Sequence, residues 1–367
     1  MTTFRAPGRV NLIGEHTDYN AGFVMPAAID ASVHATITPR EDRKLQITSN
    51  NFEDEVEIDL DDPNLAARSH WSDYPVGVAV MLERAGHRLR GGRLEMRSDV
   101  PIGSGLSSSA AVEVATATAL IANSGVTVDR KELALICQKA ENEFVGARVG
   151  IMDQFVALFG EAQHALLLDC RSLEYKLLPL PPRVRLVVCN TMVKHELASS
   201  AYNERRAQCE AGVQHLARFL PNVTALRDVT FAQLEQYGGD LPDVVYRRCR
   251  HVITENARVL SAAEDLETGE LDHFGGLMAE SHRSLRDDYE VSIRELDLMV
   301  ELASHVEGVY GARMTGGGFG GSTINLVDVD HVEEFQRIVA EGYEQATGLK
   351  PEIYICEASK GAEQIES

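Results

Sequence analysis

Alternating hydrophobic and polar positions dominate the first hundred residues of the chain. Runs with this two-residue period lie at 32–38, 44–48, 55–60 and 93–98, and Asp, Asn and Gly residues separate them. A period of two places one set of side chains on the buried face of a sheet and the other set toward solvent. These runs therefore predict β-strands, and the chain is predicted to begin as sheet.

The pattern changes to a helical period after Gly105. Alanine and valine recur at helical spacing up to about Ser124, where a following glycine ends the helix. A second helix is predicted over about 129–144. The stretch 197–305 is largely amphipathic and is predicted to be mostly helical, with loops at its proline and glycine positions.

Five later runs predict further strands, at 165–169, 184–189, 311–315, 323–329 and 352–357. The proline-rich segment 179–182 cannot continue a helix and marks the predicted junction between two lobes. A length of 367 residues also exceeds that of the usual single domain. The sequence predicts an α/β (α+β) protein, with an N-terminal lobe of residues 1–180 and a C-terminal lobe of residues 181–367.

Composition and charge limit the partners that the chain can have. The sequence holds 35 Lys and Arg residues against 56 Asp and Glu residues, for a net charge of −21. Such a charge repels nucleic acid and anionic lipid, and no apolar run approaches membrane-spanning length. We expect a cytoplasmic protein without nucleic-acid or membrane partners, either a monomer or a weak homodimer.

A loop rich in glycine and serine, residues 101–111, precedes the first long helix. The backbone N–H groups of such a loop and the positive end of the helix dipole can cradle a phosphate. The loop lacks the Gly-Lys-Ser/Thr ending of a Walker A motif and the third glycine of a dinucleotide fingerprint. A core helix capped by serine explains the loop equally well. Its candidate phosphate-binding residues are Gly103, Ser104, Gly105, Leu106, Ser107, Ser108 and Ser109.

A second glycine run, residues 316–321, lies between two predicted strands, which argues against a dinucleotide site. A flexible hairpin is the simplest interpretation. Five glycines in six residues are a costly way to make one, because each glycine loses much conformational entropy on folding. We therefore expect this run to approach a ligand or the other lobe closely, and Gly317 and Gly318 are candidate nucleotide contacts.

The segment Arg9-Val-Asn-Leu-Ile-Gly-Glu-His-Thr-Asp-Tyr19 gathers a cation, two carboxylates and an imidazole. Sugar hydroxyls both donate and accept hydrogen bonds, so ionised carboxylates, which accept in pairs, suit them as ligands. Taken singly, these residues are explained equally well as turn, capping or ion-pair groups. Together with the phosphate loop, they predict a kinase for a small sugar.

Three stretches of the chain resemble the galactokinase family. They are 8–20, the Gly-Ile-Met-Asp-Gln-Phe segment at 150–155, and the segment 193–206, which begins Val-Lys-His-Glu-Leu. The phosphate loop and the second glycine run are shared by a wider family that also holds homoserine, mevalonate and phosphomevalonate kinases. The resemblance implies the two-lobed fold of that family, in which ATP and galactose meet in the cleft between the lobes.

The resemblance also implies a sugar site and a reaction. Asp153 would face the anomeric hydroxyl of galactose, with Arg9 as its charged neighbour, and the γ-phosphoryl group of ATP would pass directly to the C1 hydroxyl. The further implied sugar ligands are Glu15, His16, Asp18 and Tyr202. Because Arg9 would make Asp153 a weak proton acceptor, its role as a general base or as an orienting group stays open at this point. Lys194, Arg205 and Arg206 are interpreted as solvated charges.

For the nucleotide, the resemblance implies ATP with Mg²⁺. The implied metal ligands are Ser107, Ser108 and Glu141, with Glu143 as the alternative to Glu141. Trp71 is placed beside the adenine, although a lone tryptophan is more often a core residue. Two kinds of alternative remain: a related kinase for N-acetylgalactosamine, arabinose or a mevalonate-type alcohol, and a non-catalytic regulator that binds sugar and ATP. The intact serine loop argues against the regulator.

Overall fold

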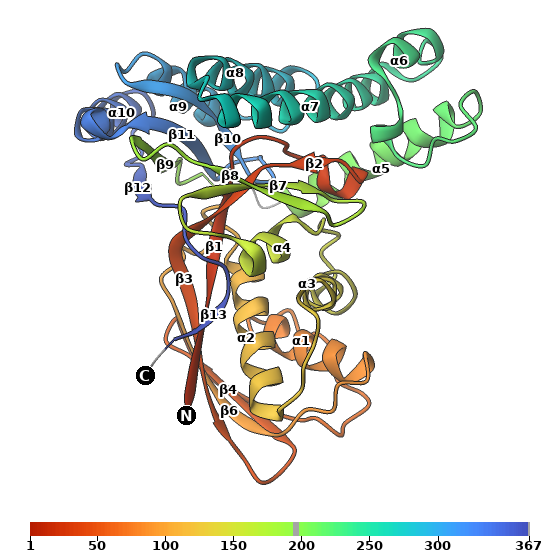
Figure 1. The fold of residues 1–367 in the computed structure, drawn as a ribbon, viewed down its shortest axis with the longest axis vertical. Helices are drawn as coiled ribbons and strands as arrows, with labels where there is room; N and C mark the ends of the chain where they lie inside the picture. The colour runs from red at the N-terminus through yellow and green to blue at the C-terminus, as the bar shows by residue number, and fades with distance from the viewer. Residues whose placement is uncertain (194–197, 366–367) are drawn as a thin grey trace.

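The structure is a computed structural model that describes residues 1–193 and 198–365. Within these two stretches, a six-stranded sheet forms the body of the lower lobe in Figure 1. Its strands, in spatial order, are β13 (Glu363–Ile365), β1 (Thr2–Asn11), β3 (Pro26–Pro39), β6 (Gly92–Ser98), β4 (Lys44–Ser49) and β5 (Phe52–Asp59). The four predicted strands of the first hundred residues are therefore confirmed.

Strand β1 was not among the predicted strands, because Pro7 and Gly8 interrupt its sequence with turn-forming residues. The structure pairs β1 antiparallel with β3, and the register shifts between Pro7 and Arg9. At that irregularity a Cβ on Gly8 would lie 2.7 Å from the carbonyl oxygen of Leu106. The apparent break in the strand is thus the place where β1 meets the phosphate loop.

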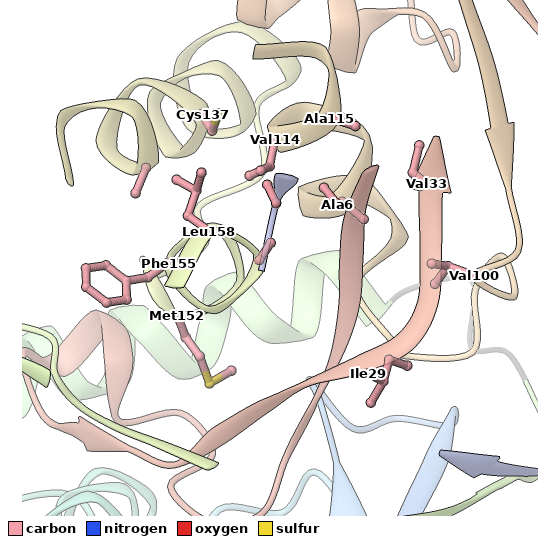
Figure 2. Packing of buried hydrophobic residues seen from close by; sticks show 14 of the residues in the cluster. Ala6, Ile29, Val33, Val100, Val114, Ala115, Cys137, Met152, Phe155 and Leu158 are labelled. Carbon is pink, nitrogen blue, oxygen red and sulfur yellow. The ribbon is translucent and has the colours of Figure 1, made fainter. Parts of the chain in front are cut away.

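Helices cover one face of this sheet. The helices α2 (Ser108–Ser124) and α4 (Met152–Phe159) contact its strands, and α1 (Asp73–Arg84), α3 (Arg130–Lys139) and a π-helical turn (Ala140–Val145) pack outside them. Figure 2 shows α2, marked by Val114 and Ala115, between the strands that carry Ala6 and Val33 and the helices that carry Cys137 and Leu158. A helix enclosed on both sides must be apolar nearly all round, which explains the alanine-rich sequence of α2.

The upper lobe is built on a four-stranded antiparallel sheet. Its strands, in spatial order, are β10 (Val309–Thr315), β11 (Ser322–Asp328), β9 (Val184–Asn190) and β12 (Glu352–Cys356). Its helices are α5 (Ala198–Leu216), α6 (Phe231–Tyr237), α7 (Asp243–Thr268), α8 (Leu271–Asp287), α9 (Arg294–Ser304) and α10 (Val332–Thr347). The second glycine run joins β10 to β11 as a hairpin, so the predicted strand–glycine–strand order is confirmed.

A small sheet of β2 (Phe23–Val24), β7 (His164–Asp169) and β8 (Tyr175–Pro179) lies between the two lobes in Figure 1. Short 3₁₀ turns occupy Asp18–Asn20, Leu226–Asp228 and Val329–His331. No helix in the described stretches is both long and apolar enough to cross a membrane.

The C-terminal strand β13 returns to the lower lobe, where Thr3 pairs with Ile365. Strands β1 and β13, from opposite ends of the described chain, consequently lie side by side at one edge of that sheet (Figure 1). The division into two lobes near residue 180 stays a prediction. It would assign residues 363–365 to the C-terminal lobe, whereas the strand pairing places them in the six-stranded sheet of the lower lobe. The sequence of β13 is too short to show a hydrophobic period, so only the pairing reveals where it belongs.

Candidate active site

A cavity of about 310 Å³ opens where the phosphate loop, the segment after β1, the start of α4 and the glycine hairpin meet. Fourteen of the predicted site residues line it: Arg9, Glu15, His16, Asp18, Gly103, Gly105, Leu106, Ser107, Ser108, Ser109, Glu141, Asp153, Tyr202 and Gly317. Segments that are far apart in the sequence thus converge on a single space.

The centre of the cavity is an ion pair between Arg9 at the end of β1 and Asp153 in the first turn of α4. The Nε and Nη2 atoms of Arg9 each donate to one oxygen of Asp153, both at 2.7 Å, and Nη1 donates to the carbonyl oxygen of Gly105 at 2.6 Å. A guanidinium that binds a carboxylate through two parallel hydrogen bonds fixes its orientation. The hydroxyl of Ser107 donates to the same carboxylate.

Ser107 stands at the N-cap of α2, yet its side chain makes no capping hydrogen bond. Its hydroxyl is directed to Asp153 instead, and its backbone adopts φ +61°, a left-handed conformation that is strained for a residue with a side chain. The interpretation of the loop as a core helix capped by serine is therefore wrong for Ser107. Without a side-chain cap, the first backbone N–H groups of α2 remain suited to an anion.

Glu15 is buried, and the structure shows why its carboxylate is tolerated there. Its Oε1 accepts from the backbone N–H of Gly316 at 2.8 Å and from the Thr315 hydroxyl at 3.1 Å, while its Oε2 accepts from Arg313 Nη1 at 2.8 Å. Burial raises the pKa of Glu15, although the Arg313 guanidinium opposes the shift. Glu15 therefore ties the N-terminal segment to the glycine hairpin of the other lobe.

His16 is held by a chain of hydroxyl groups. Its Nδ1 lies 2.8 Å from the Tyr19 hydroxyl, which lies 2.7 Å from the Tyr289 hydroxyl. The rings of Tyr202 and Tyr289 lie 5.3 and 4.7 Å from the imidazole, measured between centroids. Burial lowers the pKa of His16 to about 3, so the ring is neutral at physiological pH. A neutral imidazole with a fixed Nδ1 is a directional hydrogen-bonding group.

Asp18 lies against the backbone of the Gly-Ile-Met-Asp segment. A Cβ at position 150 would lie 1.8 Å from Asp18 Oδ2, so only glycine fits beside this carboxylate. Burial and the neighbouring charge of Asp153 raise the pKa of Asp18 to about 7. The cavity thus holds two carboxyl groups of unequal character, one clamped by Arg9 and one that readily keeps its proton.

Glu141 and Glu143 both lie on the π-helical turn, and the structure separates them. Glu141 is buried and lines the cavity, whereas Glu143 is exposed. Burial and the charge of Asp153 raise the pKa of Glu141 to about 7. The predicted helix over 129–144 did not include this change to a π-helix, which is a frequent feature of functional sites.

Several residues that hold the cavity were missed by the sequence analysis. Arg313 reaches Glu15 from β10, and His251 Nε2 lies 3.1 Å from the Glu15 carbonyl oxygen. The carboxylate of Glu255, also on α7, accepts from the Gly14 N–H at 3.0 Å. In the sequence, Arg313 is a charged residue within an apolar strand, but His251 and Glu255 lie among the many polar residues of an amphipathic helix, so no local signal identifies their partners.

Comparison with known proteins agrees with this geometry. Family models match the chain at residues 2–39 (galactokinase galactose-binding signature), 73–161 (GHMP kinases N terminal domain) and 262–345 (GHMP kinases C terminal). A curated galactokinase of Roseiflexus sp. (strain RS-1) is 48% identical over 361 residues, which cover 98% of this chain and 92% of the relative.

Solved structures give the same result. The structure of Lactococcus lactis galactokinase complexed with galactose superposes with a TM-score of 0.96 at 37% identity, covering 99% of this chain and 95% of the other. The chain belongs to the galactokinase family. It is therefore an ATP-dependent sugar kinase. A mevalonate kinase of 17% identity shares the fold, with a TM-score of 0.69 over 98% of this chain and 100% of the other.

Three of the predicted site residues lie outside the cavity lining. Trp71 stacks on Phe52, with ring centroids 5.1 Å apart, so a place beside the adenine stays a prediction. Ser104 is buried, and its hydroxyl donates to the Pro101 carbonyl oxygen at 2.8 Å. A Cβ on Gly318 would lie 2.4 Å from the Val291 carbonyl oxygen, which indicates a packing role for this glycine.

Arg205 is not the solvated charge that the sequence analysis expected. It is buried, and it donates to the carbonyl oxygens of Tyr289 at 2.7 Å and Glu290 at 2.9 Å. Arg206 lies over the Tyr19 ring, 5.8 Å from its centroid. Lys194 and the rest of the segment 194–197 lie outside the described residues.

Proposed function

We propose that the chain transfers the γ-phosphoryl group of ATP directly to the C1 hydroxyl of α-D-galactose, giving galactose 1-phosphate. The observation that carries this proposal is the clamped Asp153, which lies in the same cavity as the phosphate loop and the sugar-binding segment. A single space of about 310 Å³ brings an acceptor hydroxyl and a terminal phosphate within reach of the same carboxylate. No phosphoenzyme is needed, because the two substrates meet directly.

In this proposal, Asp18, His16, Glu15 and Tyr202 bind the sugar hydroxyls. Asp18 and the neutral His16 offer sites that can accept hydrogen bonds, and Tyr202 adds a ring and a phenol. Glu15 already accepts hydrogen bonds from Arg313, Thr315 and Gly316, so its main contribution is to fix the segment that carries His16 and Asp18. A sugar epimer that left a buried carboxylate without a donor would bind poorly.

The phosphate groups of ATP are assigned to the N-terminus of α2. The glycines at 103 and 105 have φ +75° and +81°, conformations that leave the backbone open to close approach. The N–H groups of the first turn and the helix dipole would stabilise the charge on the transferred group. Arg9 supports this loop directly, because its Nη1 donates to the Gly105 carbonyl oxygen.

Mg²⁺ fits the oxygen groups that line the same cavity. Glu141 supplies a carboxyl group whose pKa is raised to about 7 by burial and, second, by the charge of Asp153, and a bound cation would offset that charge. Ser108 also lines the cavity, whereas the hydroxyl of Ser107 is engaged with Asp153. We therefore assign the ion to Glu141 and Ser108, which suit a hard cation that prefers oxygen ligands. When bound, Mg²⁺ neutralises charge on the β- and γ-phosphates.

Asp153 is assigned the role of orienting the C1 hydroxyl. Its two oxygens accept hydrogen bonds from Arg9 and Ser107, so it is held rigidly and its negative charge is largely compensated. Phosphoryl transfer passes through a loose transition state, in which the attacking hydroxyl loses its proton late. Position therefore matters more than basicity for this group.

Replacement of Asp153 tests the proposal. In Asp153→Asn and Asp153→Ala we expect turnover to fall by about 10²–10⁴-fold, because the hydroxyl is no longer held in line. Galactose binding, measured by calorimetry, should persist in both variants. Near-normal turnover in both would remove Asp153 from the chemistry.

An acceptor panel tests the substrate. ADP release is measured with galactose, glucose, N-acetylgalactosamine, arabinose and mevalonate as acceptors. We expect galactose to be the preferred acceptor. Preference for another acceptor would indicate a related kinase, and binding of galactose and ATP without ADP release would indicate a regulator. Galactose at background would overturn the assignment.

A further inference from the structure

A buried hydrogen-bond chain runs from the core of the lower lobe to the cavity. Its centre is Gln154 on α4, which is fully buried. The Nε2 atom of Gln154 donates to Glu141 Oε2 at 2.7 Å and to Glu113 Oε2 at 2.9 Å. Glu113 belongs to α2, Gln154 to α4 and Glu141 to the π-helical turn, so the chain links three separate elements.

Glu113 is out of place as a core residue. It has no exposed surface, and it lies on a helix whose other buried positions are mostly alanine, valine and leucine. Its second oxygen, Oε1, and the Oε1 of Gln154 have no hydrogen-bond partner among the described residues. A buried polar group without a full set of partners costs stability. An apolar side chain would fill this position without that cost, so packing alone does not explain Glu113.

The end point of the hydrogen-bond chain explains why Glu113 is polar. The hydrogen-bond chain ends on Glu141, which is its one member that lines the cavity. Glu141 lies on a short π-helical turn, where the regular hydrogen-bond ladder that fixes an α-helix is altered. The orientation of its carboxyl group is set by side-chain donors: Gln154 holds Oε2 at 2.7 Å, and the Ser109 hydroxyl is a second donor near this carboxyl. Groups that orient a metal-ligating side chain through a hydrogen bond contribute strongly to metal affinity.

We infer that Gln154 and Glu113 are positioning residues for the cation ligand Glu141. Gln154 holds one oxygen of Glu141 through its amide nitrogen, which leaves the second oxygen for Mg²⁺. Glu113 accepts the other amide hydrogen and so fixes the side chain of Gln154. This inference rests on the proposed role of Glu141 as a metal ligand.

The test measures Mn²⁺ binding by electron paramagnetic resonance, with a non-hydrolysable ATP analogue present, on the full chain. Gln154→Met keeps the size of the side chain and removes the donor, and Glu113→Met removes the acceptor. Both should weaken Mn²⁺ binding by about 10–100-fold. Glu113→Gln keeps an acceptor oxygen and should rescue binding to within about threefold of the parent, since the role needs an acceptor and not a charge.

Two further measurements separate positioning from folding. The melting temperature and galactose affinity of Gln154→Met should stay close to those of the parent, and the Mg²⁺ concentration for half-maximal rate should rise. The exposed Gln214 on α5 supplies a matched control, because Gln214→Met should change none of these quantities. If Glu113→Met fails to fold, Gln154→Met alone decides the outcome.

Unchanged Mn²⁺ binding in Gln154→Met would overturn the inference. So would weaker Mn²⁺ binding that is accompanied by a lower melting temperature and weaker galactose binding, because general unfolding would then explain it. Glu141→Gln, measured in parallel, separates the role of Glu141 as a metal ligand from the role of Gln154 as a positioning residue. Normal Mn²⁺ binding in Glu141→Gln would remove the metal assignment itself. Weak binding in Glu141→Gln together with normal binding in Gln154→Met would remove only the positioning role.

Discussion

At the scale of single residues, the cavity concentrates carboxyl groups whose ionisation the fold has changed. Asp18 and Glu141 both have pKa values of about 7, because burial and the charge of Asp153 disfavour their ionised forms. Arg9, by contrast, binds Asp153 through two hydrogen bonds of 2.7 Å. The surroundings of Asp18 and Glu141, and not their residue type, therefore decide that these carboxyl groups keep a proton up to near neutral pH.

The raised pKa of Asp18 predicts a pH-dependent loss of stability in the ligand-free protein. The folded state binds this proton more tightly than the unfolded state, whose carboxyl has the usual pKa of 3.8, so stability falls as pH rises from there to about 7. Asp18→Asn removes this loss because the amide stays neutral. The difference in free energy of unfolding between Asp18→Asn and the parent should widen by at most about 1.4 kcal/mol per pH unit and level off above about pH 7. Urea denaturation across this range measures it, and a constant difference would contradict the prediction.

At the scale of elements, α8 and β10 meet through glycine. A Cβ on Gly275 would lie 1.6 Å from the Tyr310 carbonyl oxygen, so the helix and the strand touch through their backbones. This contact fixes the height of α8 above β10, the strand that carries Arg313 and leads into the glycine hairpin. A local feature of helix packing thus sets the position of residues at the cavity.

Gly275→Ala is predicted to destabilise the protein by about 1–3 kcal/mol, because the methyl group forces the two backbones apart. The neighbouring Gly276 supplies the control, since a Cβ there meets no atom within 4 Å. Gly276→Ala should stabilise the protein by about 0.4–1 kcal/mol through the lower entropy of the unfolded chain. Chemical denaturation measures both variants. Equal effects at the two positions would show that backbone contact is not the cause.

At the scale of the whole molecule, a buried ion pair joins the two lobes. Arg313 is 0% exposed and Glu15 is 2% exposed, and the atoms that pair lie 2.8 Å apart. The pair connects β10 of the upper lobe to the segment that follows β1 of the lower lobe. The geometry of the proposed sugar site therefore depends on how the lobes are docked.

Arg313→Met is predicted to cost about 3–5 kcal/mol of stability, because it leaves the Glu15 carboxylate buried without its partner. Galactose affinity should fall with it. The double variant Glu15→Gln/Arg313→Met should recover part of the stability, since glutamine keeps an acceptor for Gly316 and carries no charge. As a control, Arg337 and Glu341 pair at the surface with 59% and 67% of their side chains exposed, and Arg337→Met should change stability by less than about 1 kcal/mol. No recovery in the double variant would show that the buried charge is not what destabilises Arg313→Met.

The sequence predicted those elements whose pattern lies within a few neighbouring residues. Alternation of hydrophobic and polar residues predicted the strands at 44–48 and 93–98, alanine-rich helical spacing predicted α2, and the glycine run predicted the hairpin between β10 and β11. It also predicted fourteen residues that line the cavity, because the motifs carry a resemblance to the galactokinase family as well as local chemistry. It missed β1, where Pro7 and Gly8 suggested a turn, and the π-helical turn, whose sequence is compatible with an ordinary helix.

By itself, the sequence determined the family, the strands with clear alternation and the alanine-rich helix, but it did not reveal α1, α4, α10, β1, β2, β8 or β13. Only the tertiary structure decided that the Ser107 hydroxyl binds Asp153 instead of capping α2, that Arg205 is buried, and that Trp71 stacks on Phe52. Hydrophobic period and turn chemistry act over a few neighbouring residues, so they can be seen along the chain. The partner of a polar side chain is chosen by packing between segments up to hundreds of residues apart, as Glu15 and Arg313 show, and that choice exists only in the folded molecule.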